Sequence, residues 1–128
     1  MDFSGTWEVY YEENLEEFLK AVGAPEMIVK MRKEFKPRII IEQNGKDFSY
    51  TIKTPVGNNT YTFTLGKESE IAGPTGRKYK CKFREENGKL ISQSEKMTSV
   101  REIIGEDMVE VILSVFYCYI IDMFLINS

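Results

Sequence analysis

Apolar and polar residues alternate with a period of two along most of this chain, and this alternation limits the fold more than any other feature. It is plainest in PRIIIEQNGKDFSYTIKTP, where Phe48, Tyr50 and Ile52 fall on one face and polar residues fall on the other. This pattern is typical of antiparallel strands with one buried face. Asn44 and Gly45 predict a tight turn between two such strands, because both residue types tolerate positive φ angles.

The alternation returns in later segments. TYTFTL groups its Tyr, Phe and Leu on one face, and RKYKCKFR sets Tyr79, Cys81 and Phe83 opposite a row of Lys and Arg. Because this basic row alternates with apolar positions, we interpret it as a solvated strand face and not as a phosphate-binding patch. Turn signals at PVGNN, LGKE, GPTG, EENG and GEDM are spaced as in a meander of short strands.

Residues 14–35 break the alternation. Apolar positions in NLEEFLKAVG and PEMIVKMRKEF recur at helical spacing, which predicts two short amphipathic helices. Asn14 suits a helix N-cap, Gly23 a helix end, and Pro25 the start of the second helix. The two helices follow the first strand, GTWEVYY, and only strands follow them. This order predicts an all-β fold, an antiparallel up-and-down barrel of about ten strands with a helical lid over one mouth and room inside for a small apolar molecule.

Composition narrows the function classes. The 128 residues, 42% of them hydrophobic, suit one domain over residues 1–128, and the net charge of −3 argues against a nucleic-acid-binding role. The chain has no His, which excludes His-dependent triads and His-ligated metal sites, and two cysteines alone cannot form a zinc site. The start of the chain lacks the pattern of a secretory signal, so we expect free thiols at Cys81 and Cys118 in a cytoplasmic setting. No carboxylate pair is marked out for acid-base chemistry, and we expect neither an enzyme nor a bound cofactor.

Five stretches carry a more specific signal: FSGTWEVYYEENLEEFLKAVG, KEFKPRIIIEQNGKDF, NTYTFTLGKESEI, GKLI and SVREIIGEDMVE. Together, through residues 2–110, they resemble the intracellular lipid-binding proteins, the fatty-acid-binding family. GKESEI is similar to the liver and bile-acid-binding branch, whereas SVRE is similar to the heart and adipocyte branch. The resemblance implies a ten-stranded β-clam that carries a fatty acid or a bile acid through the cytoplasm. It also implies a monomer with no nucleic-acid partner, and it is compatible with transient membrane contact.

Arg101 is the first candidate for ligand chemistry. In KMTSVREII it shares a strand face with Ser99 and Ile103, while Val100 and Glu102 face the other way. A guanidinium removed from water needs an anion, and a ligand head group can be that anion. The resemblance implies the same role, since family members with Arg at this position bind the fatty-acid carboxylate with it. The alternative is a solvated Arg101 that pairs weakly with Glu102.

Two further groups of residues are candidates. The predicted cavity wall mixes hydroxyl and thiol groups with apolar side chains, whereas a dry core would hold fewer polar groups. Its members are Ile41, Tyr50, Ile52, Phe63, Cys81, Phe83 and Ser99. Each member taken singly is also compatible with ordinary core packing. The resemblance implies a portal where flexible methionines adapt to differently shaped lipids. Its members are Met27, Ile28, Met31, Val56 and Thr75. The alternative for the two methionines is docking of the helix on the barrel rim.

The final stretch, VILSVFYCYIIDMFLINS (residues 111–128), departs from the rest of the chain. Every residue from Val111 to Ile126 is apolar except Ser114 and Asp122, and the stretch holds no Gly, Lys or Arg. Family members usually end in a strand with an inward Arg and often a Tyr, so the resemblance stops at Glu110. As a helix, the apolar run would span only about 24 Å, short of the roughly 30 Å hydrocarbon core of a bilayer.

We therefore expect residues 111–128 to be foreign to the fold, as in a splice or readthrough isoform with impaired ligand binding. A β segment that completes the barrel is the second interpretation, and a membrane anchor is the third. With a foreign or imperfect last strand, the barrel would keep an exposed sheet edge and an exposed apolar surface. Such a chain would be prone to aggregation or to membrane association.

Overall fold

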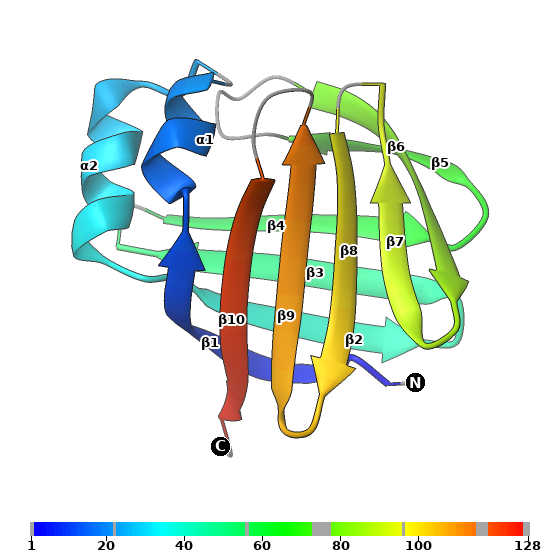
Figure 1. Cartoon of the computed structure of the whole chain (residues 1–128). Coiled ribbons are helices and arrows are strands. Elements are labelled where there is room, and N and C mark those ends of the chain that lie inside the picture. The colour runs from blue at the N-terminus through cyan, green and yellow to red at the C-terminus, as the bar shows by residue number, and fades with distance from the viewer. Residues whose placement is uncertain are drawn as a thin grey trace.

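Ten strands form one antiparallel sheet that curls back on itself, with two helices at one end (Figure 1). The computed structural model describes residues 2–21, 23–55, 57–72, 78–95, 97–114 and 118–126. The helices are α1 (Leu15–Ala21) and α2 (Glu26–Glu34). The strands are β1 (Gly5–Glu13), β2 (Arg38–Asn44), β3 (Asp47–Thr54), β4 (Gly57–Thr64), β5 (Glu68–Ala72), β6 (Lys78–Glu86), β7 (Lys89–Gln93), β8 (Met97–Ile104), β9 (Asp107–Ser114) and β10 (Cys118–Ile126). The all-β class, the strand number and the helical pair after the first strand are confirmed.

The sheet follows the order β4-β3-β2-β1-β10-β9-β8-β7-β6-β5, so β4 and β5 are its two edges. These edges contact each other, but no hydrogen-bonded register joins them among the described residues. The barrel expected from the sequence is therefore open at this seam. Aromatic packing bridges it, because Phe63 on β4 stacks on Phe83 of β6 with ring centroids 3.6 Å apart.

β10 lies between β1 and β9 and pairs antiparallel with both (Figure 1). Its residues 120–126 pair with residues 6–13 of β1, and its residues 118–124 pair with residues 107–113 of β9. β9 itself continues without a break from Glu110 into Val111. For residues 111–114 and 118–126, the expectation of a segment foreign to the fold is therefore wrong, and so is the expected exposed edge at the last strand.

The β completion, our second interpretation, describes what residues 118–126 do. A continuous apolar run is compatible with a strand buried between neighbours as well as with a helix, and available partners decide between them. The residues that connect β9 to β10, 115–117, lie outside the described residues. The membrane-anchor interpretation also fails for β10, and no described helix has the length and apolar character needed to cross a bilayer.

Local signals place the helices where the sequence predicted them. Asn14 directly precedes α1, and its carbonyl accepts a hydrogen bond from the Phe18 N–H at 3.0 Å. Gly23 has a φ of 79° in the connection, a conformation that costs glycine little. The carbonyl of Pro25 accepts from the Ile28 N–H at 2.9 Å and begins α2.

The turn between β2 and β3 differs by one residue from the prediction. Asn44 still belongs to β2 and pairs with Asp47, which leaves Gly45 and Lys46 as the two turn residues. Only Gly45 has a positive φ, of 64°. This is the arrangement in which glycine is needed at the first of the two turn positions. The predicted strand faces are unaffected, since Phe48 and Tyr50 are both buried.

Candidate ligand cavity

A cavity of about 660 Å³ lies inside the curled sheet and extends to the helices. Its size falls within the range of pockets that hold small-molecule ligands. The lining is mostly apolar with a few polar groups. It comprises Leu15, Phe18, Leu19, Ile28, Met31, Arg32, Pro37, Ile39, Tyr50, Ile52, Thr54, Gly57, Asn58, Asn59, Tyr61, Ile71, Tyr79, Cys81, Phe83, Ser92, Ser94, Met97, Ser99, Arg101, Glu110 and Ile112.

Arg101 and Glu110 form a buried ion pair in this cavity. They are register partners on β8 and β9, and Arg101 Nη2 lies 2.6 Å from Glu110 Oε2. Their exposed fractions are only 6% and 4%. The predicted inward position of Arg101 is thus observed, and the solvated alternative is wrong. The anion that meets the guanidinium in this structure is a side chain of the protein itself.

Sequence reasoning missed Glu110, although a signal for it was available. GEDM predicts the turn between β8 and β9, and a tight hairpin at Gly105 and Glu106 pairs Ile104 with Asp107. Counting outward from that pair places residue 110 opposite residue 101. Alternation then turns both side chains to the same face of the sheet.

The guanidinium keeps unused hydrogen-bonding capacity. Nε and Nη1 of Arg101 are buried and have no hydrogen-bond partner among the described residues. The guanidinium carbon lies 4.8 Å from the ring centroid of Tyr50, a cation–π arrangement. Tyr50 in turn stacks on Tyr61 with centroids 5.0 Å apart, and Ser99 Oγ donates to Ser92 Oγ at 3.1 Å. We call this cluster the polar end of the cavity. It holds one ion pair, two hydrogen-bond donors without a partner among the described residues, and several neutral hydroxyl groups.

Burial controls protonation at this polar end. It raises the pKa of the Tyr50 phenol to about 12 and the pKa of Tyr61 well above its ordinary value, so both remain neutral. It also raises the pKa of the Cys81 thiol. For Arg101, burial opposes the charged form and is the largest single effect. The Glu110 carboxylate together with the phenols of Tyr50 and Tyr61 more than offsets it and holds the pKa of this guanidinium above its ordinary value. Arg101 is charged throughout the physiological range.

Beside this polar end the interior is aromatic, since Tyr61 also lies 6.2 Å from Phe63 between ring centroids. Phe48 stacks on Phe63 at 4.9 Å between centroids, and Phe63 stacks on Phe83 at 3.6 Å. Of these three rings only Phe83 reaches the cavity. Phe63 and Ile41, both predicted as cavity wall, are buried core residues that do not line it. We refer to this three-ring stack as the aromatic floor of the cavity.

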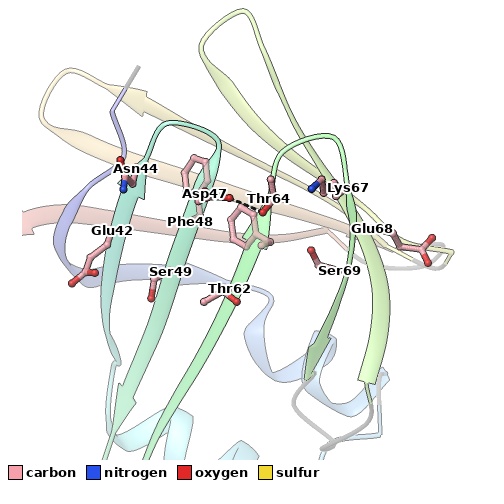
Figure 2. Close-up of a pocket in the computed structure, with 11 residues that line it drawn as sticks. Glu42, Asn44, Asp47, Phe48, Ser49, Thr62, Thr64, Lys67, Glu68 and Ser69 are labelled. Atoms are coloured by element: carbon pink, nitrogen blue, oxygen red, sulfur yellow. Dashed lines mark hydrogen bonds between the residues drawn. The ribbon is translucent and has the colours of Figure 1, made fainter.

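A second pocket of about 560 Å³ adjoins this floor. Figure 2 shows the polar residues that line this pocket, among which Thr64 Oγ1 donates to Asp47 Oδ1 at 2.7 Å. Phe48 and Phe63 contribute the apolar part of its lining. The two pockets are therefore lined by different rings of one aromatic stack.

The remaining predicted wall residues gather in the cavity. Tyr50, Ile52, Cys81, Phe83 and Ser99 all line it. Residues that the sequence reasoning passed over line it as well, and most follow the same period of two on strands already assigned. They include Ile39, Tyr61, Ile71, Tyr79, Met97 and Ile112.

The predicted portal residues divide into three groups. Ile28 and Met31 line the cavity from α2, whereas Met27 is 75% exposed and does not line it. Helical spacing explains the difference, since Met27 and Ile28 are neighbours on different faces of the same turn. Val56 and Thr75 lie outside the described residues.

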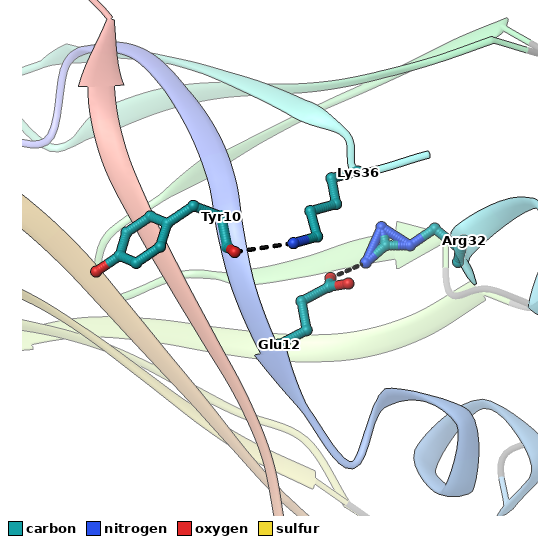
Figure 3. A network of polar contacts seen from close by, with 4 residues as sticks. All are labelled: Tyr10, Glu12, Arg32 and Lys36. Carbon is teal, nitrogen blue, oxygen red and sulfur yellow. Dashed lines mark hydrogen bonds and ion pairs between the residues drawn. The ribbon is translucent and has the colours of Figure 1, made fainter. Parts of the chain in front are cut away.

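A polar bridge fastens α2 to β1 beside the cavity (Figure 3). Arg32 pairs with Glu12, and both side chains are largely buried. Lys36, just after α2, donates from Nζ to the Tyr10 carbonyl at 2.8 Å. Arg32 also lines the cavity, so this bridge holds the second cationic side chain of the described lining.

A curled antiparallel sheet with a helical pair beside an internal, mostly apolar cavity and a buried polar cluster defines a binding protein for a small amphipathic molecule. The family model for the lipocalin and cytosolic fatty-acid-binding proteins matches residues 1–120, past Glu110 and into β10. The chain belongs to this family. The resemblance drawn from the sequence is thereby confirmed.

Individual relatives agree with this assignment. The liver fatty acid-binding protein of Schroederichthys bivius is 44% identical over 110 residues, covering 86% of this chain and 87% of the relative. Gastrotropin of Mus musculus is 32% identical over 112 residues, covering 87% and 88%. Among solved structures, the "REP1-NXSQ fatty acid transporter" superposes with a TM-score of 0.93 at 22% identity, covering 99% of this chain and 98% of that one. The Echinococcus granulosus fatty-acid-binding protein 1 gives 0.90 at 18% identity, covering 98% of each. At these identities the structures show a shared fold.

Proposed function

We propose that this protein is a non-enzymatic carrier of fatty acids or similar single-chain amphipathic lipids. The apolar chain of the lipid would occupy the internal cavity, and its head group would lie at Arg101. The observation that carries the proposal is the large internal cavity, apolar along its walls and polar at one cluster. Family membership supports it, since the relatives named above include fatty-acid-binding proteins.

Several finer features belong to this proposal. The lipid would enter beside α2, past Ile28 and Met31, because these residues join the cavity to the helical end. The carrier would act as a cytoplasmic monomer, as expected from the sequence. Bile acids, the other ligand class expected from the sequence, stay outside the proposal because no named relative is described as binding them.

A matched pair of tryptophan substitutions tests the internal site. Cys81 and Lys82 are neighbours on β6, but Cys81 lines the cavity whereas Lys82 is exposed. We expect the delipidated protein to bind a fluorescent single-chain lipid saturably. Cys81→Trp should reduce the affinity at least about tenfold by filling the cavity, and Lys82→Trp should leave it unchanged.

Denaturant unfolding of each variant would establish that it is folded, since overpacking can itself destabilise a core. Absence of saturable binding to the folded wild-type protein would refute the carrier function. Equal effects of the two substitutions would show that the lipid binds elsewhere.

A further inference from the structure

The charged residues that face the cavity are each neutralised by a partner within the protein. The described lining holds three charged side chains, Arg32, Arg101 and Glu110. Arg101 pairs with Glu110 inside the cavity, and Arg32 pairs with Glu12 beside it. Tyr50 and Tyr61 face Arg101 as neutral phenols. The cavity therefore offers no unbalanced positive charge within the described lining to attract an anionic head group.

An added carboxylate would meet an unfavourable arrangement. To reach the guanidinium of Arg101 it would have to lie beside Glu110, so that two carboxylates share one cation. Both members of the existing pair are more than nine-tenths buried, where water screens repulsion poorly. Like charges that share such a site disfavour each other's ionised forms. Binding a fatty carboxylate here would oppose the carboxylate already present.

An uncharged head group avoids that repulsion and uses what the site leaves free. Nε and Nη1 of Arg101 are buried donors without a partner among the described residues, and leaving such donors unpaired is costly. A carbonyl or hydroxyl oxygen can accept from them. A head group that also carries an N–H or O–H can donate to the Glu110 carboxylate or to the Ser99 hydroxyl, both of which line the same cavity.

We propose that the head-group site selects uncharged amphipathic lipids, such as fatty amides, fatty alcohols or monoacylglycerols, over fatty carboxylates of the same chain length. Arg101 contacts the head group as a hydrogen-bond donor, and Glu110 determines which charge is accepted. This specificity rests on the carrier function proposed above and assigns its ligand class.

The experiment compares two nearly isosteric ligands, a fatty acid and its primary amide, in competition against a fluorescent single-chain probe. Measurements are made at neutral pH and below the solubility limit of each ligand. We expect the wild-type protein to bind the amide at least about tenfold more tightly than the acid, because the amide carries no charge to oppose Glu110.

Glu110→Gln makes the same carboxylate-to-amide change on the protein side. It leaves Arg101 without its anion, so the preference should reverse in favour of the acid. Glu102→Gln is the matched control, because Glu102 follows Arg101 on β8 but faces outward, pairing with Lys89 at 3.7 Å. This control should keep the wild-type preference.

The outcomes separate the specificity from the carrier function. A wild-type protein that binds the acid as tightly as the amide, or more tightly, overturns the proposed selectivity while the carrier function stands. Equal preferences in Glu110→Gln and the wild-type protein would also overturn the selectivity. Failure of both ligands to bind the folded wild-type protein overturns the carrier function as well. If Glu110→Gln does not fold, the wild-type comparison alone decides.

Discussion

Two regions of the interior, the aromatic floor and the polar end, are both buried but chemically opposite. At the floor, Phe48, Phe63 and Phe83 stack ring on ring. At the polar end, Arg101 and Glu110 pair in a lining that also holds hydroxyl groups, and two guanidinium donors have no partner among the described residues. Burial is therefore a poor guide to ligand contact in this molecule. Buried hydrogen-bond donors that the protein's own side chains leave unpaired are a better guide to where a ligand binds.

This difference has an energetic side. The aromatic floor gains stability from apolar burial and ring stacking, and any ligand would have to displace those contacts. The polar end holds a desolvated ion pair, which contributes little net stability although it is costly to break. The floor thus supplies stability. The polar end instead keeps unpaired guanidinium donors, to which a ligand head group can hydrogen-bond.

The largest effect should come from opening the floor. Phe63→Ala removes the middle ring of the stack. Because Phe63 is only 3% exposed, the lost ring leaves a buried cavity. We expect the free energy of unfolding to fall by about 3–5 kcal/mol. Denaturant unfolding measures this loss.

Phe35 supplies the control for that substitution, because it is half exposed and lies outside the stack. Phe35→Ala should change stability by no more than about 0.5–1 kcal/mol. In a folded sample of Phe63→Ala, the preference between amide and acid should persist. A lost preference would mean that floor and polar end do not act separately.

Breaking the buried pair on one side should have the next largest effect. Glu110→Gln leaves the guanidinium of Arg101 buried without an anion, so the unfolding free energy should fall by about 3 kcal/mol. Replacing both members, as Arg101→Met with Glu110→Leu, removes the uncompensated charge and should restore stability to near the wild-type value or above.

The thermal or denaturant midpoints of the single variant, Glu110→Gln, and of the double variant test whether the unpaired charge causes the loss of stability. Equal losses in the single and the double variant would contradict the ion-pair argument. They would show instead that side-chain shape at these positions controls stability.

Alkaline pH should weaken the polar end but not the floor. The folded-state pKa of Tyr50 is about 12, above its ordinary value of 10.0. Its contribution is therefore fully present below pH 10 and is lost as the pH rises toward 12, by up to about 3 kcal/mol. Tyr50→Phe keeps the ring but removes the phenol, so the unfolding free energy of this variant should fall less over the same pH range. Parallel pH profiles for the two proteins would contradict the assignment.

Much of this arrangement was predictable from the sequence, and the reasons are local. Strict alternation around Tyr50, Cys81 and Arg101 determines which side chains face inward, and few barrel architectures have two helices directly after the first strand. The family resemblance could also be identified from the sequence motifs. Proximity across strands was harder, because it requires the register as well as the face, and the pairing of Glu110 with Arg101 was missed for that reason.

The errors have physical explanations too. Phe63 faces inward, but its ring is covered by stacking against Phe48 and Phe83. Ile41 is buried in the core although its register partner Tyr50 lines the cavity. Alternation gives the face of a side chain but not what packs over it. The last strand was misjudged because its apolar run carries neither period nor turn signal. Its pairing with β1 and β9 is a long-range property that local sequence does not encode.

A second ion pair, outside the polar cluster, should give the smallest effect and so sharpens the comparison. Arg32 and Glu12 join α2 to β1 at the rim, and their side chains are 13% and 8% exposed, more than those of the inner pair. Arg32→Gln should therefore reduce the unfolding free energy by only about 1–2 kcal/mol, between the values typical of exposed and buried pairs.

Because the bridge between Arg32 and Glu12 holds α2 beside the cavity, Arg32→Gln should also release a bound lipid faster, and stopped-flow transfer to vesicles would measure this rate. Its preference between amide and acid should stay that of the wild-type protein, since the charge beside Arg101 is untouched. A changed preference with unchanged release would place head-group recognition at the rim, and not at the inner pair.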